Sequence, residues 1–175
     1  LHDALPILMQ NVDILIEAAK LMKDDKDIWF HIIGNGVYKD KLEARAKEYG
    51  ITNISFWPMQ PPELAPAIYS AADVNVIPLV KDVYRTALPS KTATCLACQK
   101  PIIFAIGKGS KFGKNAMKEV GSIVVESDDP HELSIAITSL KRFESSSDYG
   151  SYFSRYFGLT NNSRRYSVII TDNLR

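Results

Sequence analysis

The 175-residue sequence predicts an α/β fold in which a doubly wound parallel sheet is covered by helices on both faces. Short apolar runs typical of buried strands alternate along the chain with segments whose apolar residues recur at helical spacing. The loops between them are short, which favours right-handed crossovers between parallel strands. The length suits one compact domain.

The first half of the chain predicts three helices and three strands. We expect Asn11 to cap the first helix, Gly50 to end a helix over 39–49, and Pro61 and Pro62 to begin the third. The run IWFHII (28–33) is continuously apolar, so we expect a strand buried on both faces with Trp29 in the core. The other strands are expected at 54–56 and 74–79, and the inner helix faces at Val12, Leu15, Ile16, Ala19 and Met22, and at Leu64, Ile68 and Ala71.

The second half predicts three more helices and two more strands. A short helix begins at Pro89-Ser90-Lys91. A second, marked by Phe112, Ala116, Met117 and Val120, closes at Gly121. Asp129 and Glu132 resemble a capping box that opens a helix with Leu133, Ala136, Ile137 and Leu140 inward. Strands are expected at 102–105 and 123–125.

These elements divide the chain into three parts. Residues 10–143 form the expected domain, and residues 144–175 form a linker (ESSSD) and a helical tail that packs across the domain or reaches a partner domain. Residues 1–9 match no expected element, and we expect them to be non-native.

Composition excludes several classes of function. The net charge of +1 provides no field to attract nucleic acid, and no apolar run approaches the length of a membrane span. Two cysteines without a targeting segment favour a cytoplasmic setting. Because Cys95 and Cys98 lie within a helix and no second pair exists, we expect them to pack rather than bind metal.

Ligands of open α/β sheets bind at the carboxyl ends of the strands, where four loops are candidates. The loop Gly34-Asn35-Gly36 follows the first expected strand, and its glycines would let backbone N–H groups approach a phosphate, although a tight turn explains them equally well. It lacks the third glycine of a dinucleotide fingerprint, which disfavours a nicotinamide cofactor.

The second loop, around Phe56, Trp57, Met59 and Gln60, suits a planar base or simply packs over the sheet edge. Pro78 marks the third loop. In the fourth, Leu88 and Pro89 precede Ser90 and Lys91 at a helix start, where the hydroxyl and the ammonium would hold a phosphate. The alternative is that Lys91 points into water.

Four stretches in order resemble the C-terminal nucleotide-sugar-binding domain of retaining GT-B glycosyltransferases. The resemblance covers about residues 10–142 and is strongest to bacterial polysaccharide enzymes of the fucosaminyl-transferase and colanic-acid groups. The stretches are QNVDILIEAAKLM, FHIIGNGVYKDKLEARAKEYGITNISFWP, LAPAIYSAADVNVIPL and LPSKTATCLACQKPIIF.

The resemblance implies a Rossmann-like half that binds a nucleotide diphosphate sugar, with uracil as the expected base and no metal or other cofactor. A partner domain would bind a saccharide or lipid-linked acceptor, and the full-length protein would act in the cytoplasm or at the inner face of the membrane. The implied diphosphate site comprises Gly34, Asn35, Gly36, Ser90 and Lys91. The implied base, ribose and sugar contacts are Phe56, Trp57, Met59, Gln60, Pro78, Thr86, Leu88, Pro89 and Thr94. No catalytic residue is expected in this chain.

The sequence also departs from the family pattern. Thr86 and Thr94 stand where many relatives carry two glutamates, and Gln10 stands where many carry a phosphate-binding lysine. The central first strand of the family domain is missing or replaced, because the stretch LHDALPILM does not resemble it and Pro6 is poorly tolerated in a central strand. Two alternatives therefore remain: a non-catalytic sugar-nucleotide-binding module, and a sugar-nucleotide epimerase of the same architecture.

Overall fold

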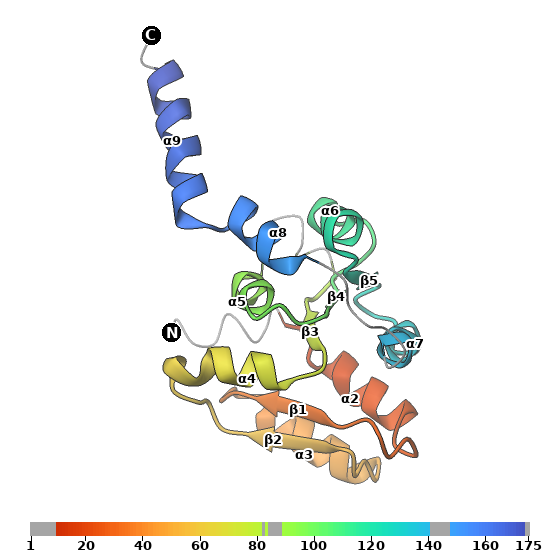
Figure 1. Ribbon diagram of the computed structural model, residues 1–175. Coiled ribbons are helices and arrows are strands. Elements are labelled where there is room, and N and C mark those ends of the chain that lie inside the picture. The colour runs from red at the N-terminus through yellow and green to blue at the C-terminus, as the bar shows by residue number, and fades with distance from the viewer. Residues whose placement is uncertain (1–9, 82, 84–88, 141–147, 174–175) are drawn as a thin grey trace.

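The computed structural model describes residues 10–81, 83, 89–140 and 148–173. Helices and strands alternate as expected, and Figure 1 shows their arrangement. The helices are α2 (Asp13–Leu21), α3 (Lys39–Glu48), η1 (Pro62–Leu64), α4 (Ala65–Ala71), α5 (Lys91–Ala97), α6 (Lys111–Val120), α7 (Pro130–Leu140), α8 (Tyr149–Tyr156) and α9 (Leu159–Asn173). The strands are β1 (Phe30–Ile33), β2 (Ile54–Trp57), β3 (Asn75–Pro78), β4 (Ile102–Ala105) and β5 (Ile123–Val125).

All strand pairs are parallel, which confirms the predicted fold class, but the described strands form two sheets rather than one. β1 pairs with β2, from Phe30 opposite Ile54 to Ile33 opposite Trp57. The second sheet has the order β3-β4-β5. Residues 1–9, where the sequence predicts that the first strand is missing or replaced, lie outside the described residues, so that expectation stays a prediction.

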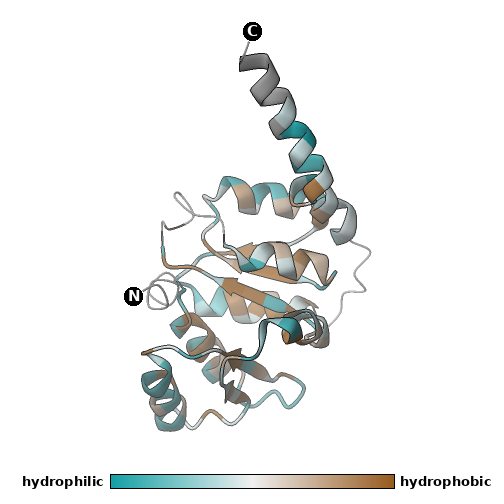
Figure 2. Ribbon diagram, turned by 90° about the vertical axis from the view of Figure 1, so that its left-hand side faces the viewer, coloured by the Kyte–Doolittle hydropathy of each residue, from teal (hydrophilic) through white to brown (hydrophobic). Residues whose placement is uncertain are grey.

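One apolar core links the two sheets through α2. Ile16 and Ala18 of α2 are fully buried, and this cluster also contains Phe30 of β1 and Ile103 of β4. The helix packs against α7 and α3. A second cluster lies around Leu96 of α5, Phe104 of β4, and Tyr149 and Tyr152 of α8. In Figure 2 the central strands are coloured as apolar, and the helices around them are mixed.

The expectation that β1 is buried on both faces was wrong. Phe30 is buried, but His31 and Ile33 are exposed and Trp29 is 57% exposed. The face of β1 that carries His31 and Ile33 is therefore covered only in part by the described residues. His31 is therefore no core residue, and its Nδ1 lies 2.7 Å from the Ser55 hydroxyl oxygen.

Two further expectations about helices were wrong. The N-cap position of α2 is Val12 rather than Asn11, whose side-chain amide instead donates to the Ser127 carbonyl at 2.6 Å. No residue of α4 or η1 is buried, although Leu64, Ile68 and Ala71 were expected to face inward. The helix connects β2 to β3, so it runs between two sheets where one continuous sheet was expected.

The tail contains two helices. Asp148 caps α8 by accepting a hydrogen bond from the Ser151 N–H, and α8 packs against α5. Figure 1 shows α9 projecting from the body beyond α8. Residues 1–9 and most of the expected linker lie outside the described residues.

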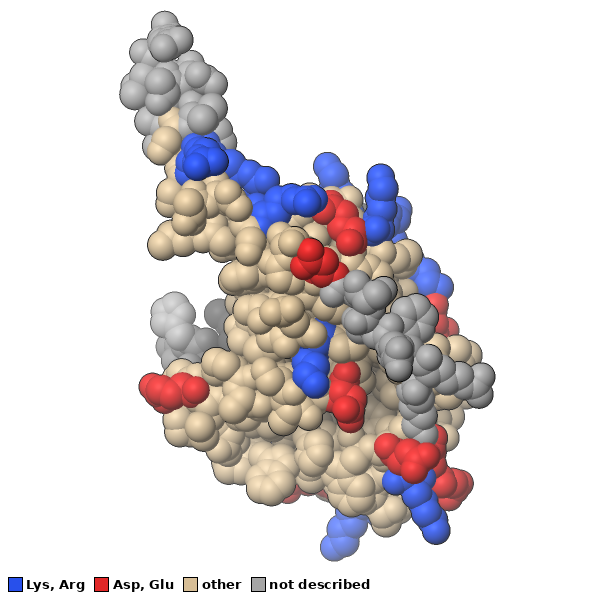
Figure 3. Space-filling view, in the orientation of Figure 1, with Lys and Arg blue, Asp and Glu red and all other residues tan. Residues whose placement is uncertain are grey.

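The described surface is mixed in charge. Figure 3 shows basic and acidic side chains interspersed on the face in view, separated by uncharged areas. In the described part of the chain, no helix has the length and apolar character needed to cross a bilayer.

Candidate functional site

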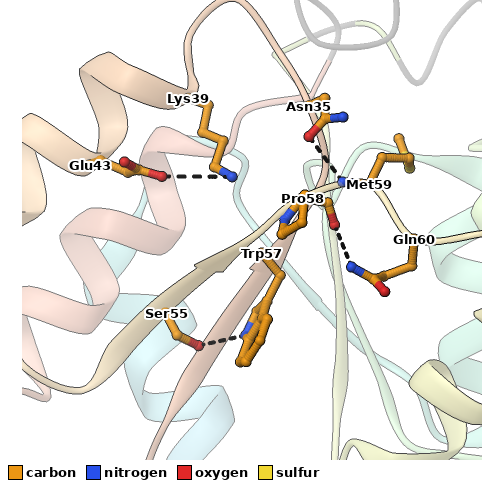
Figure 4. Close-up of polar contacts among 8 residues, drawn as sticks. All are labelled: Asn35, Lys39, Glu43, Ser55, Trp57, Pro58, Met59 and Gln60. Carbon is orange, nitrogen blue, oxygen red and sulfur yellow. Dashed lines mark hydrogen bonds and ion pairs between the residues drawn. The ribbon is translucent and has the colours of Figure 1, made fainter.

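Two of the four candidate loops meet at the carboxyl ends of β1 and β2. The Asn35 side-chain oxygen accepts a hydrogen bond from the Met59 N–H at 3.0 Å, as Figure 4 shows. Just before it, the Gly34 N–H donates to the Trp57 carbonyl at 3.1 Å. The Gly36 carbonyl then accepts from the Lys39 N–H at 2.9 Å and leads the chain into α3. Asn35 therefore ties the glycine loop to the loop that follows β2.

The loop after β2 presents large apolar side chains to solvent. Trp57 is 50% exposed and Met59 is 62% exposed. The Gln60 side-chain amide donates to the Pro58 carbonyl at 2.9 Å, which orders the turn (Figure 4). Phe56, by contrast, is partly buried and packs against the core.

A shallow pocket opens beside this loop. Its volume is about 210 Å³, and its lining is Ile33, Trp57, Gln60, Leu64 and Ile68. The apolar side chains come from β1, β2, η1 and α4. The pocket therefore lies between the loop after β2 and the side of η1 and α4 that carries Leu64 and Ile68.

The other candidate residues follow β3. Pro78 ends this strand and is buried, and Pro89 leads into α5. Ser90 stands at the N-cap position, but its side chain makes no capping hydrogen bond, so its hydroxyl is not committed to the helix. Thr94 is half-buried one turn further along. Thr86 and Leu88 lie outside the described residues.

Lys91 is the first residue of α5. The residue is exposed as a whole, but desolvation of its amino group lowers its pKa from the ordinary value, and the nearby Cys95 thiol opposes this shift. Burial raises the pKa of Cys95 to about 12, so this thiol stays protonated at neutral pH. Cys98 lies 3.6 Å from the Pro66 carbonyl oxygen, in keeping with the expected packing role.

Lys39 is a second cation at a helix start that our sequence reasoning missed. It begins α3 directly after the glycine loop, and its ammonium lies 3.7 Å from the Glu43 carboxylate (Figure 4). The signal was the same one that singled out Lys91, a lysine in the first turn of a helix that follows a strand-end loop. Its pairing with Glu43 offsets part of its charge.

The carboxyl ends of β4 and β5 are joined by an acidic and basic cluster. The Glu126 N–H donates to the Glu132 carboxylate at 2.9 Å, and the Lys108 N–H donates to the Glu126 carboxylate at 3.3 Å. The Lys108 ammonium also pairs with Glu132, and this hydrogen bond raises the pKa of Lys108. These groups hydrogen-bond and pair with one another, and so they connect the loop after β4 to the loop after β5.

The candidate residues thus fall into two groups at the carboxyl ends of parallel strands. The loops after β1 and β2 are hydrogen-bonded to each other, whereas Ser90 and Lys91 belong to the other sheet. The first group provides the glycine loop and exposed apolar side chains, and the second provides a hydroxyl that makes no capping hydrogen bond and a desolvated cation. This combination suits an anion attached to a flat, partly apolar group.

Comparisons with known proteins agree on one family. Residues 5–142 match the family model described as "Glycosyl transferases group 1". The chain is 29% identical over 114 residues to WcaI of Escherichia coli (strain K12), which is named as a glycosyl transferase of colanic acid biosynthesis, and 24% identical over 106 residues to WbjE of Pseudomonas aeruginosa. These matches cover 65% and 61% of this chain but only 26% of each relative.

Solved structures show the same fold. Alr3699/HepE of Anabaena, solved in complex with UDP-glucose, has a TM-score of 0.70 at 16% identity over 91% of this chain and 44% of its own. The catalytic domain of the cholesterol-α-glucosyltransferase of Helicobacter pylori has a TM-score of 0.59 at 16% identity, covering 85% of this chain and 92% of its own.

Proposed function

Because the chain belongs to the glycosyl transferases group 1 family and has the fold of one half of a GT-B enzyme, we propose that it binds the sugar donor of a glycosyltransferase. The donor is a nucleotide diphosphate sugar. The reaction breaks the bond between the sugar and the diphosphate and joins the sugar to an acceptor oxygen. The acceptor, a saccharide or a lipid-linked saccharide, binds to a partner domain.

The observation that best supports this proposal is the hydrogen bond from the Met59 N–H to the Asn35 side-chain oxygen. It holds the glycine loop, which offers backbone N–H groups, next to a loop with exposed Trp57 and Met59 side chains. Backbone N–H groups can hydrogen-bond a phosphate, and exposed aromatic and apolar side chains can pack against a base or a sugar ring. After β3, Ser90 adds a hydroxyl that makes no capping hydrogen bond, and Lys91 adds a cation.

UDP is the proposed nucleotide. The solved neighbours Alr3699/HepE and pneumococcal GtfA are described in complex with UDP-glucose and with UDP and GlcNAc. The name of WcaI supports an acceptor in cell-envelope polysaccharide biosynthesis. We further propose that the full-length protein works at the cytoplasmic face of the membrane and needs no metal ion.

In this proposal, the residues of this chain stabilise the leaving group. The diphosphate gains negative charge as the sugar departs, and the Lys91 ammonium and the backbone N–H groups of the glycine loop offset that charge. Thr94 hydrogen-bonds a sugar or ribose hydroxyl. The groups that activate the acceptor belong to the partner domain, so the chain alone binds the donor without transferring it.

Calorimetric titration of the chain with UDP, GDP and ADP tests this proposal. We expect saturable binding of UDP, weakened about tenfold by Lys91→Ala, which corresponds to about 1.4 kcal/mol. Lys100→Ala is the matched control, because Lys100 follows the opposite end of α5. Asn35→Ala is expected to weaken binding severalfold by releasing the Met59 N–H.

Two results would contradict the proposal. A folded chain that binds none of the three nucleotides is not a donor-binding half. Equal weakening by Lys91→Ala and Lys100→Ala would place the diphosphate elsewhere. Binding without transfer by the full-length protein, in the presence of an acceptor, would favour a non-catalytic module.

A further inference from the structure

The surface formed by α6, α8 and the start of α9 is predominantly basic. Residues 111–120 and 149–165 carry six lysines and arginines and a single acidic residue, although the net charge of the whole chain is only +1. In Figure 3, Lys and Arg side chains gather at the upper end of the view, over α6 and the part of α9 near the body. We call this the basic surface, and its charged members are Lys111, Lys114, Lys118, Arg155, Arg164 and Arg165.

The lysines of the basic surface form one stripe on α6. Lys111, Lys114 and Lys118 are all exposed, and their spacing of three and four residues places them on one face of the helix. Ala116 and Val120 lie on the buried face. Among the described residues, no acidic side chain forms an ion pair with any of the three lysines. Their positive charge therefore remains available to a partner.

Contacts through Glu119 connect this stripe to the arginines of α8 and α9. The Glu119 carboxylate accepts a hydrogen bond from the Tyr156 hydroxyl at 2.7 Å and pairs with the Arg155 guanidinium at 3.1 Å. The Arg165 guanidinium in turn lies 5.7 Å from the centre of the Tyr156 ring. The one acidic side chain of this region therefore links α6 to α8, and the basic surface is continuous across the three helices.

Large apolar side chains are exposed within the basic surface. Leu159, the first residue of α9, is 82% exposed, and Met117, which lies one turn from Lys114 on α6, is 46% exposed. Cations interspersed with exposed apolar side chains suit an anionic lipid surface, because the apolar groups enter the headgroup region while the cations meet the lipid phosphates. A protein partner fits less well, since the centres of protein interfaces are poor in lysine.

We propose that the basic surface docks this chain onto a membrane that contains anionic lipids. The lysines of α6 and the arginines of α8 and α9 face the lipid phosphates, and Leu159 and Met117 enter the headgroup region. The binding is peripheral and reversible, and it weakens as salt screens the charges. This inference goes beyond donor binding and does not depend on it, so nucleotide titration and membrane binding can fail separately.

Co-sedimentation of the chain with lipid vesicles tests the proposal. The probes are vesicles of phosphatidylcholine alone and vesicles that also contain about 30% phosphatidylglycerol, both at an ionic strength of about 0.1 M. We expect the chain to bind the anionic vesicles only, and to bind them more weakly as salt is added. The triple variant Lys111→Gln/Lys114→Gln/Lys118→Gln should bind at least about tenfold more weakly.

A matched triple variant controls for the loss of charge. Lys23→Gln/Lys26→Gln/Lys47→Gln removes the same charge from exposed residues that follow α2 or lie on α3. These lysines lie outside the basic surface, so their loss should weaken binding by less than about threefold.

A second pair of variants tests the apolar contribution. Leu159→Ser should weaken binding to the anionic vesicles by about threefold or more. Ile135→Ser is its control, because Ile135 of α7 is also an exposed apolar residue, at 69%, but lies outside the basic surface. This control should bind as the unchanged chain does. Circular dichroism and the thermal unfolding midpoint establish that each variant is folded.

Three outcomes would overturn the proposal. The first is a folded chain that does not bind the anionic vesicles. The second is equal weakening by the two triple variants, which would mean that the basic surface is not the contact. The third is binding to poly-L-glutamate without binding to the vesicles, which would identify an acidic protein as the partner.

Discussion

At the scale of single residues, Lys91 is the informative case. The dipole of a helix disfavours a cation in the first turn, and the desolvation that lowers the pKa of Lys91 disfavours its charged form further. A bound diphosphate reverses both effects, because the anion interacts with the charged lysine and with the helix start together. The sequence identified this lysine from its position alone, but its desolvation depends on packing that the sequence does not reveal.

The pH dependence of nucleotide binding should report this lysine. A bound dianion favours the protonated amine, so affinity is full below the pKa of Lys91 in the free chain and falls as the pH rises through it. Since that pKa lies below the ordinary value of 10.5, the fall should begin at a lower pH than for an unperturbed lysine. Titrations with UDP between about pH 7 and 10 measure this fall in affinity. The Lys91→Arg variant should lack the part of the fall that comes from the lysine, because arginine keeps its charge. Identical profiles for the two proteins would remove Lys91 from the site.

At the scale of elements, the sequence predicted best where the signal is local. Gly121 was expected to end α6 and does so with a left-handed backbone, φ 66°. Asp129 was expected to cap α7, and its carboxylate accepts the Glu132 N–H at 2.9 Å. The expected capping box is only half formed, because the Glu132 side chain bonds the Glu126 N–H instead. That partner comes from the loop after β5, which no local pattern can indicate.

Expectations failed for β1 and α4. Their apolar runs predicted burial, but His31 and Ile33 of β1 are exposed and no residue of α4 is buried. Likewise, sequence reasoning found the loops of Asn35 and Met59 separately. Their hydrogen bond depends on the register of β1 and β2 across 24 residues, so only the structure shows it.

Substitution of Asp129 should measure how much the cap on α7 contributes to the free energy of unfolding. Asp129→Ala removes the acceptor of the Glu132 N–H and is expected to lower the free energy of unfolding by about 0.5–2 kcal/mol. Asp128→Ala is the neighbouring control; it removes an exposed ion pair with Lys81 and should cost about 0–1 kcal/mol. Urea unfolding of both variants provides the comparison. A larger loss from Asp128→Ala than from Asp129→Ala would contradict the assignment.

At the scale of the whole molecule, two bodies of structure meet through α2 and α7, while α9 stands apart. Gly158 joins α8 to α9 where space is short, because a Cβ atom there would lie 2.5 Å from the Ser154 carbonyl oxygen. The main packing partner of α9 is α8. The described core therefore lies within the elements from α2 to α8.

Removal of α9 should leave that core intact. A chain that ends at Phe157 is expected to keep its thermal unfolding midpoint within a few degrees, since about 1 kcal/mol shifts a domain of this size by roughly 2–4 °C. Ile16→Ala is the contrasting variant: Ile16 is fully buried in α2, and its truncation should cost about 2–5 kcal/mol. Calorimetric scans measure the thermal unfolding midpoints of the shortened chain and of the Ile16→Ala variant. Loss of cooperative unfolding in the shortened chain would show that α9 belongs to the core.

The pairing of α2 with α7 also has a consequence for biosynthesis. Ribosomes add about 5–20 residues per second. Because α2 begins at Asp13 and α7 begins at Pro130, the first helix waits roughly 6–23 s for its partner. During that interval the apolar face with Ile14 and Ile16 lacks the cover that α7 provides in the folded chain. Exposed apolar surface of this kind is prone to aggregation, and slow translation prolongs that exposure.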